Sequence, residues 1–495
     1  MRLKVKHLDI ISKYPAAVFN EKDAFEIGIK AGDRVLLKAG EKEKTCIAEI
    51  TESVVSQGEI GIDRNVDFKA NYVSIEVLSK PRSIKYIKKK LSGMELSEKE
   101  IKCILEDVNK EALSDIEIAM FLSAVYVNDY SDRELLHVTK YMVESGMQME
   151  WKKKYVADKH SIGGVPGNRI SPIVVSIVAA AGITIPKTSS RAITSPAGTA
   201  DTMEVFCDVC FSIEEIRKIV KKTNGCLVWG GALDIAPIDD KLIRIEHPLS
   251  IDPKGQVLAS VMSKKKAIGS KYVVIDIPIG NEAKVKSKES AKILAKRFKN
   301  LGNALGMNVN CFITAGEEPI GRGIGPVLEC IDVMKILKNE YRGLEDLRNK
   351  ALLFAGEILS MCGKGGIKEA KKILESGKAL KKFREIVEAQ NGSIDKDLES
   401  MVGKNVYEFK AEEAGRVMGI NIRDIAEIAR RAGCPADKSA GIYMEVKKGD
   451  IVAKDQTLFR IYSSKIRRLR DAINYAKLSE PIWISERYDL LVEKV

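Results

Sequence analysis

The chain has 495 residues, of which 45% are hydrophobic, and it carries a formal net charge of +12. At about 100–200 residues per domain, this length predicts three or four domains with real cores, which excludes wholesale disorder. Its apolar runs fall short of the ~18–20 residues that span a bilayer, and its first residues lack the apolar stretch of a signal peptide. We therefore expect a cytoplasmic protein with no membrane partner.

The first part of the chain, residues 1–84, reads as a small β-barrel-like domain. Leu3–Lys6 and Val73–Val77 alternate apolar and polar side chains, and Arg34–Lys38 is a short apolar run between charges. Lys80–Ser83 is a linker. Residues 85–154 follow as a helical domain, because three capping boxes precede apolar runs of helical period. These boxes are Ser97/Glu100, Ser114/Glu117 and Ser131/Glu134.

From residue 155 the pattern changes to strands that alternate with helices, which predicts a mostly parallel α/β domain over 155–405. Tyr155–Ala157, Cys226–Trp229 and Tyr272–Ile277 read as strands, and Pro172–Ala181 as a buried helix. Residues 406–495 mix strand and helix signals, so we expect an α+β domain there.

The first stretch that carries chemistry is Asp158–Asn168, a glycine-rich loop between a strand and a helix. Its glycines let a ligand approach the backbone, the helix start favours anions, and Lys159 and Ser161 add donors. This pattern predicts a phosphate cradle. A plain strand–helix turn is the alternative.

A second stretch, Thr188–Glu204, gathers hydroxyls, one arginine and a glycine. Such donors suit phosphate and ribose oxygens. Two loops of this kind at the ends of neighbouring strands form a crevice in an α/β sheet. The alternative is a solvated Ser/Thr loop.

A third stretch holds Asp252, a candidate general acid, and Ser260 and Lys264, which share one face of a helix at i and i+4. By sequence alone, Asp252 is as readily a helix cap, and an exposed helix face is the favoured interpretation of the lysines. Lys284 follows a strand end, where ligands of parallel sheets bind.

Other features favour structural roles. The basic cluster Lys465–Arg470 has helical spacing without aromatic interleaving, which favours a solvated helix face over a nucleic-acid patch. Cys207 and Cys210 form a lone pair, which favours a buried structural pair over a metal site. Only five glutamines occur, a composition that leans towards a thermophilic source.

Two of these stretches in order, Asp158–Gly164 and Ser189–Glu204, resemble the signature of the thymidine and pyrimidine nucleoside phosphorylase family. The resemblance runs from about residue 85 to the C-terminus. It implies a helical domain hinged to an α/β domain, with 232–268 returning to the helical part. It also implies that the base meets Ser260 and Lys264. The phosphate site would use Lys159, Ser161, Ser171, Ser189 and Thr199.

The chain departs from the nucleoside-specific members at three places. Ala192–Ser195 replaces a glycine-rich run, the base-facing arginine has no clear equivalent, and the N-terminal domain is additional. In all three it resembles the branch that acts on nucleoside 5′-monophosphates, the archaeal AMP phosphorylases.

That resemblance implies phosphorolysis of AMP, and also of CMP and UMP, to a free base and ribose 1,5-bisphosphate in nucleotide degradation. Inorganic phosphate is the co-substrate, no cofactor or metal is expected, and assembly is a homodimer or larger homo-multimer. Asp252 would be the proton donor. The nucleotide would be held by Gly164, Ser190, Arg191, Ala192, Ile193, Thr194, Ser195, Thr199, Ser260, Lys264 and Lys284.

Three other functions are compatible with the sequence. A nucleoside phosphorylase needs no 5′-phosphate pocket. Anthranilate phosphoribosyltransferase shares the fold class, but no acidic metal–diphosphate motif is evident. A basic RNA-binding protein is the alternative from another class, although we expect no nucleic-acid partner.

Overall fold

The computed structural model describes residues 1–12, 14–192, 195–249 and 251–485. The chain divides into two compact units, which are described separately. The first contains residues 1–137 and 241–253, and the second contains residues 138–240 and 254–495.

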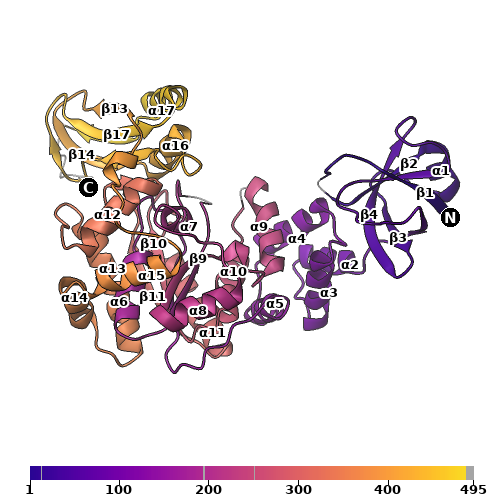
Figure 1. Ribbon diagram of the computed structural model, residues 1–495, viewed down its shortest axis with the longest axis horizontal. Helices are drawn as coiled ribbons and strands as arrows, with labels where there is room; N and C mark the ends of the chain where they lie inside the picture. The colour runs from indigo at the N-terminus through magenta and orange to yellow at the C-terminus, as the bar shows by residue number, and fades with distance from the viewer. Residues whose placement is uncertain (13, 193–194, 250, 486–495) are drawn as a thin grey trace, which may run out of the picture. The chain divides into compact units, whose positions relative to one another are not determined.

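The first unit begins with a closed barrel of six strands, as the alternating N-terminal segments predict (Figure 1). Its strand order is β1-β5-β2-β4-β3-β6, with β1/β5 and β2/β4 parallel. Its core packs Leu3, Phe19, Leu37 and Ile60. The elements are β1 (Arg2–His7), β2 (Ala16–Asn20), α1 (Glu21–Ile27), β3 (Arg34–Ala39), β4 (Lys42–Thr51), β5 (Glu59–Ile62) and β6 (Tyr72–Val77).

Helices follow the barrel, and the three predicted capping boxes all form. The Ser97 and Ser114 boxes start α3 and α4. At α5, Glu134 N donates to Ser131 Oγ over 3.1 Å, and Ser131 N donates to the Glu134 carboxylate over 2.8 Å. The helices are α2 (Ser83–Leu91), α3 (Glu98–Asn109), α4 (Asp115–Asn128) and α5 (Asp132–Glu144).

One ion pair of this unit is buried. Lys90 Nζ lies 2.7 Å from Glu134 Oε2, and the two side chains are 3% and 1% exposed. The same carboxylate accepts from the backbone of Leu96 over 2.8 Å. Glu134 therefore ties α2, α5 and the turn before α3 together.

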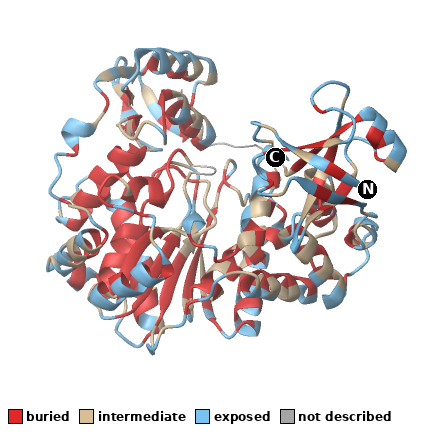
Figure 2. Ribbon diagram, turned by 45° about the vertical axis from the view of Figure 1, so that its right-hand side comes forward, coloured by how far each residue is buried: buried red, intermediate tan, exposed pale blue. Residues whose placement is uncertain are grey.

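The second unit is built on parallel strands, which confirms the predicted arrangement. β10 lies between β7 and β11, β8 pairs with β9, and a parallel bridge joins Val156 to Thr184 beside them. Buried residues run along these strands and the helices beside them (Figure 2). The strands are β7 (Ala157–Ser161), β8 (Ile185–Ser189), β9 (Gly225–Trp229), β10 (Tyr272–Ile279) and β11 (Asn308–Ala315).

Helices cover these strands. The buried helix predicted at Pro172–Ala181 is α6, which packs against α13 and α15, while α11 packs along β10 and β11. The helices and turns are α6 (Ser171–Ala180), α7 (Thr199–Met203), α8 (Ile213–Thr223), η1 (Gly230–Ala232), α9 (Pro237–Leu249), α10 (Lys254–Ala267), α11 (Lys288–Ala304), α12 (Pro326–Leu337), α13 (Glu345–Met361), α14 (Ile367–Glu375), α15 (Lys378–Ala389) and η2 (Glu399–Met401).

The C-terminal part mixes strands and helices, as predicted, and pairs with a strand from the α/β part. β12 (Gly323–Ile324) joins the sheet β12-β15-β17-β13, and a second sheet has the order β16-β14-β18. The remaining elements are β13 (Asn405–Lys410), β14 (Gly415–Ile420), α16 (Ile422–Ala432), β15 (Gly441–Met444), β16 (Ile451–Val452), β17 (Thr457–Ser463), α17 (Ile466–Ser479) and β18 (Ile482–Ser485).

The strand predicted at Tyr155–Ala157 is β7, which begins at Ala157 and runs on through the charged residues to Ser161. The predicted cysteine pair is wrong, because Cys207 is buried whereas Cys210 is exposed, and both are free thiols. The segment 241–253 groups with residues 1–137, whereas 254–267 groups with the second unit.

Candidate active site

Strand β7 carries two sets of charged and polar side chains on its two faces, because successive residues of a strand point in opposite directions. Lys159 and Ser161 lie on one face, and Asp158 and His160 on the other. Lys159 Nζ lies 3.2 Å from the hydroxyl of Ser171, at the start of α6. Three residues predicted to bind phosphate therefore gather at one place.

Lys159 is a buried cation. Burial lowers its pKa to about 7, against the attraction of Asp276, and the cations Lys187, Lys350 and Arg169 lower it further. An anion bound here would favour the charged ammonium. The site therefore has the electrostatics of an anion site.

Asp276 is the acidic centre of this face, and no motif in the sequence points to it. The β7–β10 register sets it opposite Ser161. Its carboxylate accepts from Ser161 over 2.8 Å and from Thr314 over 2.6 Å, and lies 2.8 Å from Lys350 Nζ. Although burial opposes it, Lys350 and Lys159 lower the pKa of Asp276. The Ser161 proton is thus directed at Asp276 in this structure.

Thr199 is placed by a second residue that the sequence analysis missed, Arg169. The guanidinium donates to Thr199 Oγ1 over 2.7 Å and to the Ala197 carbonyl over 2.6 Å, and its Nε donates to Glu329 over 2.6 Å. Arg169 is 6% exposed and Glu329 is 1% exposed. The buried Arg169–Glu329 pair therefore orients the hydroxyl of Thr199, a residue predicted to bind phosphate, at the start of α7.

Most polar groups of the loop after β8 form contacts that hold the conformation of the loop itself. The backbone N–H groups of Ala192 and Gly198 donate to Asp201 over 2.7 and 2.8 Å. The Arg191 guanidinium contacts Asp201 at 3.2 Å and Glu204 at 2.9 Å, and lies 4.7 Å from the centre of the Trp229 ring. Arg191 therefore fixes the loop, and its contact with a nucleotide stays a prediction.

The serine side chains of the same loop differ in their hydrogen bonds and in their exposure. Ser189 donates to the Val228 carbonyl over 3.1 Å, and Ser195 donates to the Ala197 carbonyl over 2.7 Å. Ser190 is exposed. Ile193 and Thr194, also predicted to bind nucleotide, lie outside the described residues.

Gly164 and Lys284 lie together. A Cβ on Gly164 would lie 3.5 Å from the backbone nitrogen of Lys284 and 3.5 Å from its Cγ. Gly164 has φ +91°, a conformation that favours glycine. Two residues predicted to hold nucleotide, 120 positions apart, thus share one corner at the end of β10.

The residues predicted to meet the base also lie together. Ser260 Oγ donates to Asp239 Oδ2 over 2.8 Å, and Lys264 Nζ lies 2.8 Å from the same oxygen. Asp239, on α9, is fully buried. Although burial opposes it, Asp239 and Asp240 raise the pKa of Lys264. The i, i+4 spacing on α10 is confirmed.

A buried ion cluster joins this helix to β7. Asp158 lies 2.7 Å from Lys265 Nζ and 3.6 Å from Lys187 Nζ. Burial lowers the pKa of Lys187 to about 7, against the attraction of Asp158. Lys265 follows Lys264 directly, so the cluster connects the predicted base contacts to the strand of Lys159.

Asp252, the predicted proton donor, is exposed and lies between α9 and α10. Its role stays a prediction.

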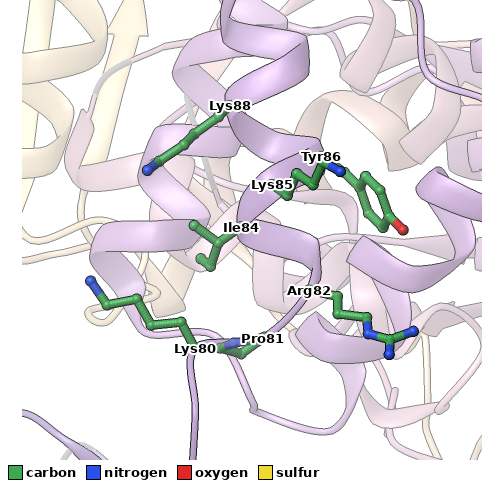
Figure 3. A pocket seen from close by; sticks show the side chains of 7 residues that line it. All are labelled: Lys80, Pro81, Arg82, Ile84, Lys85, Tyr86 and Lys88. Carbon is green, nitrogen blue, oxygen red and sulfur yellow. The ribbon is translucent and has the colours of Figure 1, made fainter.

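Elsewhere, a hollow of about 640 Å³ lies at the start of α2, lined by residues within 80–88 (Figure 3). Lys80 and Lys88 point to one side of the helix and Arg82 and Tyr86 to the other, so these cations do not converge on one ligand. Over the described ranges, no cluster of three acidic, cysteine or histidine side chains could hold a metal ion. No helix among the described residues is long and apolar enough to cross a membrane.

Comparison with known proteins defines the class first. Residues 153–380 match the α/β domain of a glycosyl transferase family, residues 84–146 match its helical bundle domain, and residues 416–482 match the pyrimidine nucleoside phosphorylase C-terminal domain. The fold also resembles anthranilate phosphoribosyltransferase from Thermus thermophilus, with a TM-score of 0.52 and 19% identity. That likeness covers 62% of this chain and 99% of the other.

Relatives over the full length then define the family. An AMP phosphorylase from Natronomonas pharaonis is 43% identical over 100% of both chains, and one from Thermococcus kodakarensis is 45% identical over 98% of both. AMP phosphorylase 1 from Archaeoglobus fulgidus is 44% identical over 95% of both. The chain belongs to the AMP phosphorylase family.

Proposed function

We propose that this chain is a pentosyltransferase that converts AMP and inorganic phosphate to adenine and ribose 1,5-bisphosphate. The observation that carries the proposal is the similarity to relatives named AMP phosphorylase over at least 95% of the chain. The additional N-terminal barrel lies within that similarity, because the first of these relatives matches over the entire length.

The chemistry of the site supports the same reaction. Phosphorolysis of a nucleoside monophosphate requires the protein to hold two phosphates, the attacking one and the 5′-phosphate. The Lys159 ammonium, the Ser171 hydroxyl and the Thr199 hydroxyl beside Arg169 suit one anion. The corner of Gly164 and Lys284 suits another.

The proposed mechanism breaks the bond between C1′ and the base nitrogen. A phosphate oxygen forms the new bond to C1′, and the electron pair of the broken bond goes to the base. A proton on a ring nitrogen makes the base a better leaving group, and Asp252 is the proposed donor. Holding the two reactants in the right orientation lowers the activation barrier by several kcal/mol.

Further parts of the proposal follow from the family resemblance. CMP and UMP are additional substrates, no cofactor is required, and the chain acts in the cytoplasm as a homodimer or larger homo-multimer. Light scattering of the purified protein tests the assembly, since a monomer mass would contradict it.

Release of free base with AMP, adenosine and thymidine in parallel tests the proposal. We expect phosphate-dependent release from AMP and little from either nucleoside. Release from the nucleosides alone would indicate a nucleoside phosphorylase. No release, together with salt-sensitive retention of polynucleotide, would favour the RNA-binding alternative.

A further inference from the structure

We propose that Lys350 is a positioning residue of the phosphate site: it neutralises the buried carboxylate of Asp276 and so leaves the charge of Lys159 to the bound anion. The inference rests on the proposed function, in which Lys159 and Ser161 hold phosphate. It gives a role in that site to α13, a helix outside both stretches of the chain that were predicted to cradle phosphate.

The first step is the carboxylate that lies beside the anion site. Asp276 is fully buried, and its Oδ2 accepts from the hydroxyl of Ser161 over 2.8 Å and from Nδ2 of Asn168 over 3.1 Å. Asp276 is thus in direct contact with a residue predicted to bind phosphate. A carboxylate in that position repels an anion, because the protein interior screens charges only weakly.

The second step is the cation that offsets this carboxylate. Lys350 Nζ lies 2.8 Å from the same oxygen of Asp276 and donates to Thr314 over 3.1 Å, and Lys350 is 9% exposed. Thr314 in turn donates to Oδ1 of Asp276 over 2.6 Å. Lys350 therefore holds the carboxylate from the side of α13 and β11, whereas Ser161 holds it from the side of β7.

The third step is the balance of charge among five groups, the cations Lys159, Lys350 and Arg169 and the carboxylates Asp276 and Glu329. Arg169 lies 2.6 Å from Glu329, and Lys350 lies 2.8 Å from Asp276. Of these five charges, the positive charge of Lys159 is left over. Asp276 also attracts Lys159. Without Lys350, a bound anion would therefore compete with a buried carboxylate for the Lys159 ammonium.

Sulfate binding, measured by calorimetry, tests this role without turnover. Lys350→Met should raise the dissociation constant of sulfate at pH 7 at least about tenfold, because an unneutralised carboxylate then lies beside the anion. Arg348→Met is the matched control, since it removes a cation from the same helix whose partner is Glu375 on α14, 2.7 Å away. The control should stay within about threefold of wild type. A dissociation constant of Lys350→Met within about threefold of wild type would overturn the inference.

The pH dependence of sulfate binding distinguishes this role from a general loss of structure. Burial lowers the pKa of Lys159 to about 7, Asp276 raises it, and Lys187, Lys350 and Arg169 lower it further. In Lys350→Met that pKa should rise, so Lys159 keeps its proton to higher pH. Sulfate affinity should then fall less between pH 6 and pH 9 than in the wild-type protein. Weaker binding with an unchanged pH dependence would indicate a merely structural role and would contradict the assignment.

A double variant tests the charge balance itself. Adding Asp276→Asn to Lys350→Met removes both charges of the pair, so the Lys159 ammonium is again available to the anion. The sulfate dissociation constant should return to within about threefold of wild type. Binding more than about tenfold weaker than wild type in the double variant would refute the inference even if Lys350→Met alone does not fold.

Kinetics connect this role to the reaction. With AMP and phosphate, Lys350→Met should raise the KM for phosphate at least about tenfold and the KM for AMP less than about threefold. Equal rises in both constants would contradict a role at the phosphate site. If the wild-type protein released no base from AMP while sulfate binding behaved as expected, the proposed function would fail and the role of Lys350 at an anion site would stand.

Discussion

The buried cation Lys159 makes anion binding depend on pH in a way that can be calculated. Its pKa lies at about 7 in this structure because burial disfavours the charged form. A dianion about 4 Å away, at an effective dielectric constant of about 20, contributes about 4 kcal/mol per unit charge. One unit charge alone raises the pKa of Lys159 by about 3, to about 10, so the dianion keeps Lys159 protonated in the complex over the whole range from pH 6 to pH 9.

The sign follows from the proton balance. Above pH 7 the free protein has lost the Lys159 proton and the complex retains it, so binding takes up a proton and weakens as pH rises. Between pH 6 and pH 9 the dissociation constant should rise about a hundredfold, and at pH 8 about 0.9 proton should be taken up per anion.

Sulfate is the suitable anion, because it stays a dianion over this range whereas phosphate titrates. Calorimetry at constant ionic strength, in two buffers of different ionisation enthalpy, gives the affinity and the proton uptake together. The matched control Lys159→Met should bind more weakly at pH 6 and show little pH dependence. A dissociation constant of the wild-type protein that changes less than threefold between pH 6 and pH 9 would refute the reasoning. An unchanged pH dependence in Lys159→Met would assign it to another group, with Lys187 the first candidate.

Three further predictions concern other residues. Asp252→Asn should lower kcat for AMP about 10²–10⁴-fold with the AMP dissociation constant unchanged, and turnover within a few-fold of wild type would contradict the role. Lys90→Met should lower the free energy of unfolding by about 3–5 kcal/mol in urea titrations, because it leaves Glu134 buried and charged. Adding Glu134→Gln should recover part of the loss, because the neutral amide oxygen still accepts from the backbone of Leu96. Arg169→Ala removes the donor that orients Thr199 and leaves Glu329 without its ion pair, so the KM for phosphate should rise about tenfold or more. An unchanged KM would show that Thr199 needs no such support.

Local signals in the sequence were sufficient for the helix starts and for the glycine loop. Each of the Ser97 and Ser114 capping boxes spans only four residues. At Gly164 the signal is equally local, because a positive φ at that one position favours glycine. Strand β7 was harder, because Asp158 and Lys159 look like surface residues. They are buried because partners arrive from elsewhere in the chain.

The missed residues share that cause. Asp276 meets Ser161 only through the register of two parallel strands, and Arg169 meets Glu329 across 160 positions. No periodicity or spacing in one sequence reports such a pair. Asp239 lies on α9, and its hydrogen bond from Ser260 on α10 depends on how two helices pack.

In the proposed reaction phosphate, and not water, attacks C1′ of a nucleoside monophosphate. Incubation of AMP with ¹⁸O-labelled phosphate, followed by ³¹P NMR, tests it directly. We predict ribose 1,5-bisphosphate with the label in the bridging oxygen at C1, formed in step with free adenine. Ribose 5-phosphate as the product, with the labelled phosphate unconsumed, would mean hydrolysis and would contradict the claim.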